Sequence, residues 1–212
     1  LEKNTEQIEW FPEHLKHGRW EKNIEAAPDW NLSRDRFWAT AMPVWEGKDT
    51  DGKKHQIVVG SYAELKELSG QELDDYHRPW VDDITFEKDG IHYTRIEKVL
   101  DGWFESGSMP FAQFHYPFEN KEWFETNFPA DFIVEYTAQT RGWFYTLMVL
   151  STALFDRPPF LNCICHGVVL DENGQKLSKR LQNYADPMDT FAEYGSDALR
   201  VTMMSSGAVK GQ

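Results

Sequence analysis

The clearest pattern of apolar and polar positions lies between residues 131 and 170. Residues 131–135 form a short apolar run that ends in the carboxylate of Glu135. Residues 140–155 then carry large apolar side chains at helical spacing, and two prolines at 158 and 159 end that pattern. The apolar positions of this helix are Trp143, Leu147, Leu150 and Leu154. Residues 160–170 form a long apolar strand, so the segment predicts a βαβ unit with parallel strands and a right-handed crossover.

Polar side chains follow the end of each predicted strand. Glu135 ends the first strand, and the lysine loop (residues 171–180, DENGQKLSKR) follows the second with Lys176 and Lys179. The carboxyl ends of parallel strands meet at one edge of a sheet, where open α/β folds bind ligands. A carboxylate there suits ribose hydroxyls, and lysines suit phosphates. The pattern therefore indicates a nucleotide site, whereas composition alone would favour a solvated surface turn for the loop.

The region 46–99 has a different pattern, with frequent glycines and dense charge. Short strands are expected at 56–59 and 91–96, with a helix near 62–68, which together predict a small inserted α+β subdomain. Four aspartates stand out in this region and favour a solvated acidic face over a cation site. They are Asp74, Asp75, Asp82 and Asp83.

The remaining segments are less regular. Residues 1–27 are mixed and charged, whereas residues 28–45 predict a loop that runs into a strand. Residues 100–120 contain Gly102, Gly107 and Pro110, which predict no regular structure, but six aromatic side chains also fall there. Such a loop is expected to pack into the core or to line an apolar pocket.

Two short helices are expected after the lysine loop, at 189–194 and 197–205, with Gly195 between them. The adjacent Met203 and Met204 are interpreted as core residues.

Composition narrows the functional classes. The 212 residues are 41% apolar and 15% aromatic, enough for one large domain or two small ones. A net charge of −13 argues against a nucleic-acid-binding surface over the whole chain, so any basic patch is local. Two cysteines are too few for a disulfide framework, which favours a cytoplasmic location. No signal peptide is evident, and no apolar run approaches the roughly 20 residues that span a bilayer.

Two clusters of potential metal ligands do not predict a metal site. Cys163 and Cys165 lie on one face of their strand and His166 on the other, so the three cannot converge on zinc. His14 and His17 are three residues apart, as in an adenine-binding His-x-Gly-His signature. Lys16 occupies the glycine position of that signature, and no strand is expected before it, so a surface turn or short helix is the simpler interpretation.

Five segments together resemble a known family. The run 176–180, Lys-Leu-Ser-Lys-Arg, resembles the Lys-Met-Ser-Lys-Ser signature of class I aminoacyl-tRNA synthetases. Four further segments resemble the isoleucyl members of that family, in the same order. They are WNLSRDRFW (30–38), HRPWVDDI (77–84), WFESGSMP (103–110) and EYTAQTRGWF (135–144). The Gln-Thr-Arg-Gly-Trp-Phe run separates the isoleucyl enzymes from their valyl and leucyl relatives.

The resemblance implies an α/β fold with a Rossmann-like parallel sheet, the second half of a split class I synthetase catalytic domain. Residues 28–45 and 100–212 would form that half, residues 46–99 an inserted connective subdomain, and residues 1–27 the tail of a preceding editing insertion. The family's His-x-Gly-His signature is not in this sequence. The resemblance therefore implies a fragment, which is expected to be inactive alone.

The resemblance also implies a reaction. The family joins isoleucine to ATP as isoleucyl-adenylate and transfers the acyl group to tRNA(Ile), with Mg²⁺ on the ATP phosphates and no protein-bound zinc or other metal expected here. Lys176 and Lys179 would be catalytic, by stabilising charge on the leaving pyrophosphate, and Lys179 would also bind ATP. The remaining implied contacts are Glu135, Gln139, His166 and Gly167 for the adenylate, and Trp103 and Trp143 for the isoleucine side chain.

Several positions depart from the family pattern. Leu177 and Arg180 replace Met and Ser of the signature, and Tyr136 and Ala138 stand where many members have Gly and Asp. The loss of Asp at 138 removes a possible ribose contact. A non-catalytic nucleotide- or partner-binding module and a valyl-type relative are the alternative interpretations.

Overall fold

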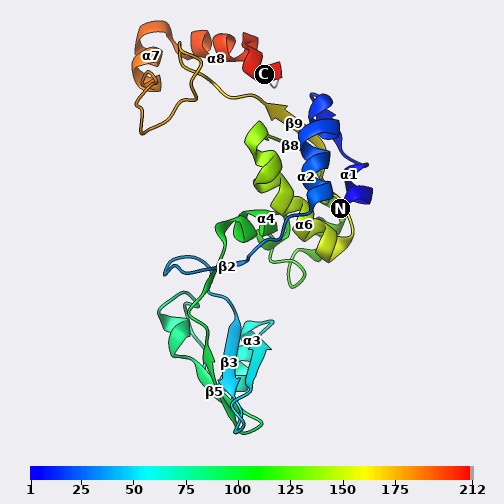
Figure 1. The fold of residues 1–212 in the computed structure, drawn as a ribbon, viewed down its shortest axis with the longest axis vertical. Coiled ribbons are helices and arrows are strands. Elements are labelled where there is room, and N and C mark those ends of the chain that lie inside the picture. The colour runs from blue at the N-terminus through cyan, green and yellow to red at the C-terminus, as the bar shows by residue number, and fades with distance from the viewer. Residues whose placement is uncertain (211–212) are drawn as a thin grey trace. The chain divides into compact units, whose positions relative to one another are not determined.

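The computed structural model of the protein describes residues 1–210 (Figure 1). It divides into two compact units, one of Leu1–Pro28 with Ser106–Gln212 and one of Asp29–Glu105. Residues 1–28 therefore pack with the C-terminal half of the chain, and residues 29–45 pack with the segment that follows them. The assignment of 1–27 to an editing insertion and of 46–99 to a connective subdomain stays a prediction.

The first unit is built on a parallel sheet with the strand order β1-β9-β8. β8 (Ala130–Tyr136) and β9 (Phe160–His166) pair in parallel, and α6 (Trp143–Phe155) connects them. β1 (Glu9–Phe11) pairs in parallel with the other side of β9. Figure 1 shows α2 and α6 beside these strands. The parallel β-α-β succession is confirmed.

Two boundaries of this unit differ from the prediction. The helix begins at Trp143 rather than at residue 140, because Thr137–Arg141 first form a 3-10 turn, η3. β9 ends at His166 rather than at residue 170. Beyond it, Gly167 donates its N–H to the carbonyl of Ala208 at 2.5 Å, and Leu170 turns back in an antiparallel bridge with Lys176.

The N-terminal segment is more ordered than the sequence predicts. It forms α1 (Glu2–Thr5), β1, the π-helix η1 (Lys16–Trp20) and α2 (Glu21–Ala26). The expectation that no strand precedes His14 is wrong, since β1 ends three residues before it. A strand of three residues is too short for alternation to be visible. Lys16 is buried, and its Nζ donates to the carbonyls of Glu6 at 3.2 Å and Ile8 at 3.0 Å.

The core of the first unit lies on one face of the sheet. Trp10 packs against Trp20 and Phe144, with ring centroids 5.2 and 5.9 Å apart. Cys163 and Cys165 are fully buried on that face, as their alternation predicts. The other face carries exposed apolar side chains from all three strands, namely Phe11, Phe132, Val134 and Ile164. Helices therefore cover only one side of this sheet in the described residues.

The segment predicted as an irregular aromatic loop is mainly helical. α4 (Gly102–Ala112) is followed by α5 (Lys121–Asn127). Gly107 lies inside α4 and contacts α6 closely. A Cβ added at Gly107 would lie 3.0 Å from Leu150 Cδ1, so the glycine allows the two helices to pack together. Pro110 cannot donate to the carbonyl of Ser106, but the indole Nε1 of Trp143 donates to that carbonyl at 3.0 Å instead.

The second unit is an α+β structure, as predicted. β3 (Val44–Lys48), β4 (Lys54–Val58), β5 (Thr85–Lys88) and β6 (Ile91–Arg95) form an antiparallel sheet with the order β4-β3-β6-β5. The unit also contains α3 (Tyr62–Ser69), the 3-10 turn η2 (Trp80–Asp83), and the pair β2 (Ser33–Arg34) and β7 (Val99–Leu100). Its core residues are Trp45, Val59, Leu65, Val81, Ile84, Phe86, Ile91 and Tyr93.

The chain ends in α7 (Pro187–Tyr194), α8 (Ser196–Ser205) and the short turn η4 (Gly207–Lys210). Both predicted helices are confirmed, and Asp186 Oδ1 accepts the N–H of Met188 at 2.7 Å as the N-cap of α7. Met203 and Met204 are 47% and 70% exposed, so their interpretation as core is wrong. Neither α7 nor α8 contains a buried residue, so no core forms there for them to join. None of the described helices has the length and apolar character that crossing a membrane requires.

Candidate functional site

The carboxyl ends of β8 and β9 form the edge where the sequence predicts a ligand. Glu135 lies opposite Cys165, and Tyr136 lies opposite His166. Opposed residues of a parallel pair share a face, so Glu135 lies on the helix-covered face and His166 on the open face beside Tyr136. The rings of Tyr136 and His166 are 6.4 Å apart. The structure thus brings Glu135 and His166 to one edge, but to opposite faces of the sheet.

Both predicted side chains at this edge make local hydrogen bonds. Glu135 Oε2 accepts the N–H of Tyr136 at 2.8 Å. Nδ1 of His166 lies 2.7 Å from the carbonyl of Gly167, which fixes the proton on Nδ1 and leaves Nε2 as an acceptor in the neutral ring. The backbone of Gly167 is engaged on both sides, since its N–H donates to Ala208.

Gln139 lies in η3, just before α6. Its Oε1 accepts the N–H of Trp143 at 3.0 Å and so satisfies one of the unpaired donors at the start of that helix. The amide nitrogen of Gln139 has no partner within residues 1–210, which leaves a donor available near the carboxyl end of β8.

The first half of the lysine loop is a tight turn. Asp171 donates its N–H to the carbonyl of Gln175 at 2.8 Å, and Gly174 donates its N–H to the carbonyl of Asp171 at 3.0 Å. Gly174 has φ = +74°, a conformation that glycine adopts without strain. After this turn the chain reverses direction, so that Lys176 lies near Tyr136 at the end of β8.

The cations of the loop are exposed and unpaired by carboxylates in the described part of the chain. Nζ of Lys176 lies 4.9 Å from the centroid of the Tyr136 ring, which is a cation–π contact. Lys179 and Arg180 are exposed, and within the described residues neither forms an ion pair. The loop therefore presents positive charge to solvent beyond the ends of β8 and β9, where an anionic ligand can meet it.

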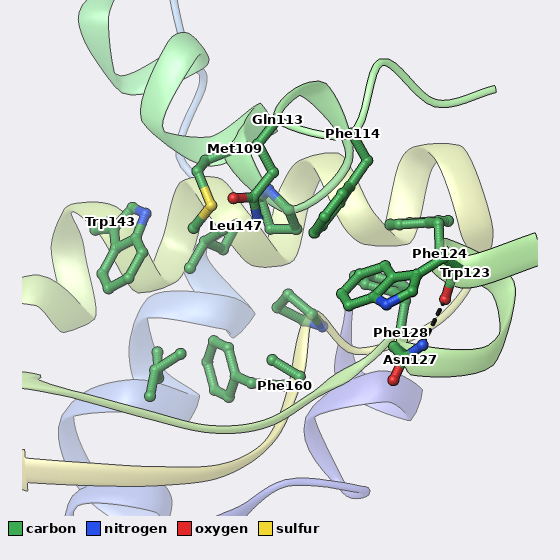
Figure 2. Close-up of a pocket in the computed structure, with 14 residues that line it drawn as sticks. Met109, Gln113, Phe114, Trp123, Phe124, Asn127, Phe128, Trp143, Leu147 and Phe160 are labelled. Carbon is green, nitrogen blue, oxygen red and sulfur yellow. Dashed lines mark hydrogen bonds between the residues drawn. The ribbon is translucent and has the colours of Figure 1, made fainter. Parts of the chain in front are cut away.

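Trp143 lines an apolar cavity of about 150 Å³ in the first unit, shown in Figure 2. Met109, Phe114 and other residues of the aromatic segment line it as well, so the expectation that this segment borders an apolar pocket is confirmed. Ala130 and Phe160, the first residues of β8 and β9, also line it. The cavity therefore extends toward the amino ends of the strands, whereas Glu135 and His166 lie at their carboxyl ends. Trp103 belongs to the second unit, and its pairing with Trp143 stays a prediction.

The two cysteines are chemically quiet. Burial raises the pKa of the Cys163 thiol far above its ordinary value and that of Cys165 to about 11, with the carboxylate of Glu135 adding to the effect on Cys165 and Arg19 opposing it. In the part of the chain that the structure describes, no group of three or more His, Cys, Asp or Glu could hold a metal ion.

Comparison with known proteins gives consistent results. The family model of class I tRNA synthetases for I, L, M and V matches residues 1–211. The isoleucine–tRNA ligases of Rickettsia peacockii and Rickettsia conorii are each 62% identical to this chain over 98% of its length. The chain spans only 19% of the length of either relative.

A solved structure supports the fold. The agnB2 LeuRS of Agrobacterium radiobacter K84, in a ternary complex with tRNA and LeuAMS, matches 90% of this chain and 27% of its own with a TM-score of 0.58. At 18% identity this likeness concerns the fold alone. It confirms the predicted α/β architecture with a parallel sheet.

Proposed function

This chain belongs to the class I tRNA synthetases, and from that premise we propose that it is part of an isoleucine–tRNA ligase. The observation that carries the proposal is the 62% identity to isoleucine–tRNA ligases over 98% of the chain. Because the chain spans only 19% of those relatives, the complete reaction would need the rest of such a protein. Residues 1–212 alone are proposed to be inactive.

The lysine loop would act on the phosphates of ATP. In the proposed reaction a carboxylate oxygen of isoleucine attacks the α-phosphorus, the bond from phosphorus to the bridging oxygen breaks, and pyrophosphate leaves with its electron pair. Lys176 and Lys179 would stabilise the negative charge that develops on that leaving group. Their exposure and their lack of carboxylate partners among the described residues support this role. Positioning and charge would carry the step, since no covalent intermediate with the enzyme is required.

The end of β8 and the end of β9 would hold the adenosine part of the adenylate. Glu135 and the amide nitrogen of Gln139 lie near the carboxyl end of β8 and suit ribose hydroxyls. His166 and Gly167 would border the nucleoside from β9. Because both backbone groups of Gly167 are already engaged, its contribution would be the space that its missing side chain leaves.

Trp143, with Trp103, would enclose the isoleucine side chain. The indole of Trp143 is fixed by its hydrogen bond to the carbonyl of Ser106 and offers an apolar surface. An apolar wall of this kind suits an aliphatic side chain. It distinguishes isoleucine from valine by only about 1–3 kcal/mol, a general range for a single methylene of which the isoleucyl enzymes are themselves a standard example.

The remaining substrates belong to the same proposal. ATP would bring Mg²⁺ on its phosphates, as is usual for that ion, and tRNA(Ile) would accept the acyl group. A cytoplasmic location fits the free, buried thiols of Cys163 and Cys165.

The test is amino-acid-dependent exchange of pyrophosphate into ATP by the full-length protein that contains this segment. Isoleucine is expected to support exchange with a kcat/KM on the order of 10²-fold above that of valine, the discrimination already known for isoleucyl enzymes as an example of what one methylene allows. A higher kcat/KM for valine than for isoleucine would contradict the proposal and indicate a valyl-type enzyme. Absence of exchange with every amino acid would favour a non-catalytic module.

A further inference from the structure

Two polar side chains hold the lysine loop at its beginning and just beyond its end. Asn183 Nδ2 donates to Asp171 Oδ2 at 2.6 Å and to the carbonyl of Lys176 at 3.3 Å. Its Oδ1 accepts the N–H of Ser178 at 3.0 Å. The Asn183 amide therefore forms hydrogen bonds with the backbone on both sides of Leu177, between the two lysines.

The carboxylate of Asp171 organises the turn that precedes the lysines. Its Oδ1 accepts the N–H of Asn173 at 2.9 Å and that of Gln175 at 2.8 Å. Together with the bond to Asn183, the carboxylate receives three donors. Hydrogen bonds from Asn183 and from Gln175 lower the pKa of Asp171, so the carboxylate is charged at neutral pH and its bond to Asn183 is charge-assisted.

Few apolar contacts fix the loop, so these hydrogen bonds carry most of its order. No residue from 171 to 180 is buried. Ser178 is also joined to the residues after the loop, since Leu181 N–H donates to Ser178 Oγ at 3.1 Å and Gln182 N–H donates to the Ser178 carbonyl at 3.0 Å. Those two bonds do not reach the turn. Removal of the Asn183 amide would therefore release the backbone at Leu177 and Ser178 from Asp171, while Lys176 keeps its bridge with Leu170.

We propose that Asp171 and Asn183 are positioning residues that preset the geometry of Lys176 and Lys179 for the phosphates. This inference rests on the proposed function. A preset loop meets the transition state without first losing conformational freedom, and small displacements of such groups are costly for catalysis. Neither Asp171 nor Asn183 needs to touch a substrate, because both act through the backbone of the loop.

The experiment uses the full-length protein and isoleucine-dependent pyrophosphate exchange. Asn183→Ala is expected to lower kcat/KM for ATP by on the order of 10²-fold, with the KM for isoleucine within about twofold of wild type. Asn173→Ala is the matched control, since the Asn173 side chain is exposed and has no partner within the described residues. It is expected to behave as wild type.

Two further variants separate positioning from a general loss of structure. The exchange Asp171→Asn with Asn183→Asp rebuilds the bond between the two side chains with donor and acceptor reversed and keeps an acceptor for the Ser178 N–H. It is expected to recover part of the activity that either single change loses, because a carboxylate at position 183 cannot donate to the Lys176 carbonyl. In a Lys176→Ala/Lys179→Ala background, Asn183→Ala is expected to add only a small further loss, because both lysines that it positions are gone. Full, multiplicative losses in that background would overturn the proposal.

The outcomes also separate this inference from the proposed function. If the wild-type protein exchanges pyrophosphate normally and Asn183→Ala exchanges it at the same rate, the positioning role is contradicted while the proposed function stands. Wild-type protein that shows no isoleucine-dependent exchange contradicts the proposed function and, with it, the inference.

Discussion

The reactivity of individual side chains in this protein depends on their surroundings, as the two cysteines show. Cys163 and Cys165 are the only cysteines of the sequence, and both are fully buried on β9. The thiolate is the reactive form of cysteine, and burial disfavours it here. The low-dielectric environment therefore makes both thiols unreactive. Composition alone does not predict this, because it does not show that they are buried.

We expect neither thiol to react with iodoacetamide in the folded chain at pH 8 within minutes, and both to react in urea. Mass spectrometry of the labelled peptide measures the outcome. Reactivity of Cys165 should rise only as the pH approaches about 11, the pKa that burial imposes on it. Rapid labelling of one thiol in the folded chain at pH 8 would contradict the account.

Asp82 is a second residue whose environment differs from the predicted solvated acidic face. The guanidinium of Arg95 is buried and bonds to Asp82 as well as to the carbonyls of Met42 at 3.2 Å and Lys98 at 2.9 Å. Arg78 Nε also donates to Asp82 at 2.8 Å. Burial raises the pKa of Asp82, but the hydrogen bonds from both arginines outweigh it and hold the pKa below its usual range.

Asp82→Asn is expected to destabilise the second unit by about 3–5 kcal/mol, because it leaves a buried arginine without its counter-charge. Asp83→Asn, at an exposed neighbour, is expected to change stability by less than about 0.5 kcal/mol. Hydrogen exchange of the β3 and β6 amides at pH 7 measures both. Equal effects of the two substitutions would contradict the burial argument.

The interaction of Asp82 with Arg95 also makes the stability of the second unit depend on pH. Because the pKa of Asp82 is lower in the folded state, its stabilisation is present above the unfolded pKa of about 3.9 and is lost as the pH falls through the folded value. The difference between wild type and Asp82→Asn should therefore shrink below pH 4.

The site shows what a sequence can and cannot specify about residues. Glu135 and Lys176 could be placed at one sheet edge, because each follows from where an apolar run ends. His166 lies inside the predicted strand 160–170 and is assigned by the family resemblance alone. The opposite facing of Glu135 and His166 could not be predicted, because it depends on the register between β8 and β9. Asn183 could not be singled out, since a lone asparagine twelve positions after Asp171 carries no recognisable pattern.

At the scale of elements, helix α4 depends on one glycine. An added Cβ at Gly107 would lie 3.0 Å from Leu150 Cδ1 and 3.1 Å from the backbone carbonyl carbon of Thr146 in α6. At Gly102, by contrast, an added Cβ would have no atom of the described residues within 4 Å apart from its chain neighbours and the backbone of its own helix. The backbone of α6 cannot easily retreat, so Gly107 sets how closely the two helices approach.

Gly107→Ala is therefore expected to lower the Tm, by a net loss of about 1 kcal/mol, since overpacking costs about 1–3 kcal/mol and alanine returns about 1 kcal/mol of helix propensity. Gly102→Ala in the same helix is expected to keep or raise the Tm. Thermal unfolding followed by circular dichroism compares them. The close approach of α4 to α6 would be disproved by equal shifts in the two variants.

Elements with long or punctuated patterns were predictable, and those that depend on distant contacts were not. The succession β8, α6 and β9, the helix α3 and the pair α7 and α8 follow from periodicity and from caps. β1 and α4 escape such patterns for physical reasons. β1 is defined by its pairing with β9, and α4 contains Gly and Pro that only its contacts with α6 and Trp143 make tolerable.

At the scale of the whole chain, the uncovered face of the parallel sheet is an apolar surface open to solvent. Phe11, Ile164 and Val134 lie side by side across β1, β9 and β8, and they are 56%, 42% and 51% exposed. β8 is also an edge strand of this sheet. Apolar faces and open edges of this kind drive association.

We expect the 212-residue chain to self-associate as its concentration rises, measured by sedimentation velocity. Val134→Lys should reduce the association, because it places a charge on that apolar face. Leu154→Lys, at a residue of α6 that is 57% exposed, is the control and should leave the association unchanged. A strictly monomeric wild-type chain, or equal effects of both changes, would contradict the prediction.

We propose that the lysine loop acts on the phosphates of ATP during adenylate formation. Lys179→Ala in the full-length protein tests it most directly, by comparing the rate of isoleucine-dependent pyrophosphate exchange with the affinity for isoleucine. The exchange rate is expected to fall on the order of 10²-fold or more, as for loss of a group that acts in the transition state, with isoleucine affinity nearly unchanged. Equal losses in rate and in isoleucine affinity would contradict it.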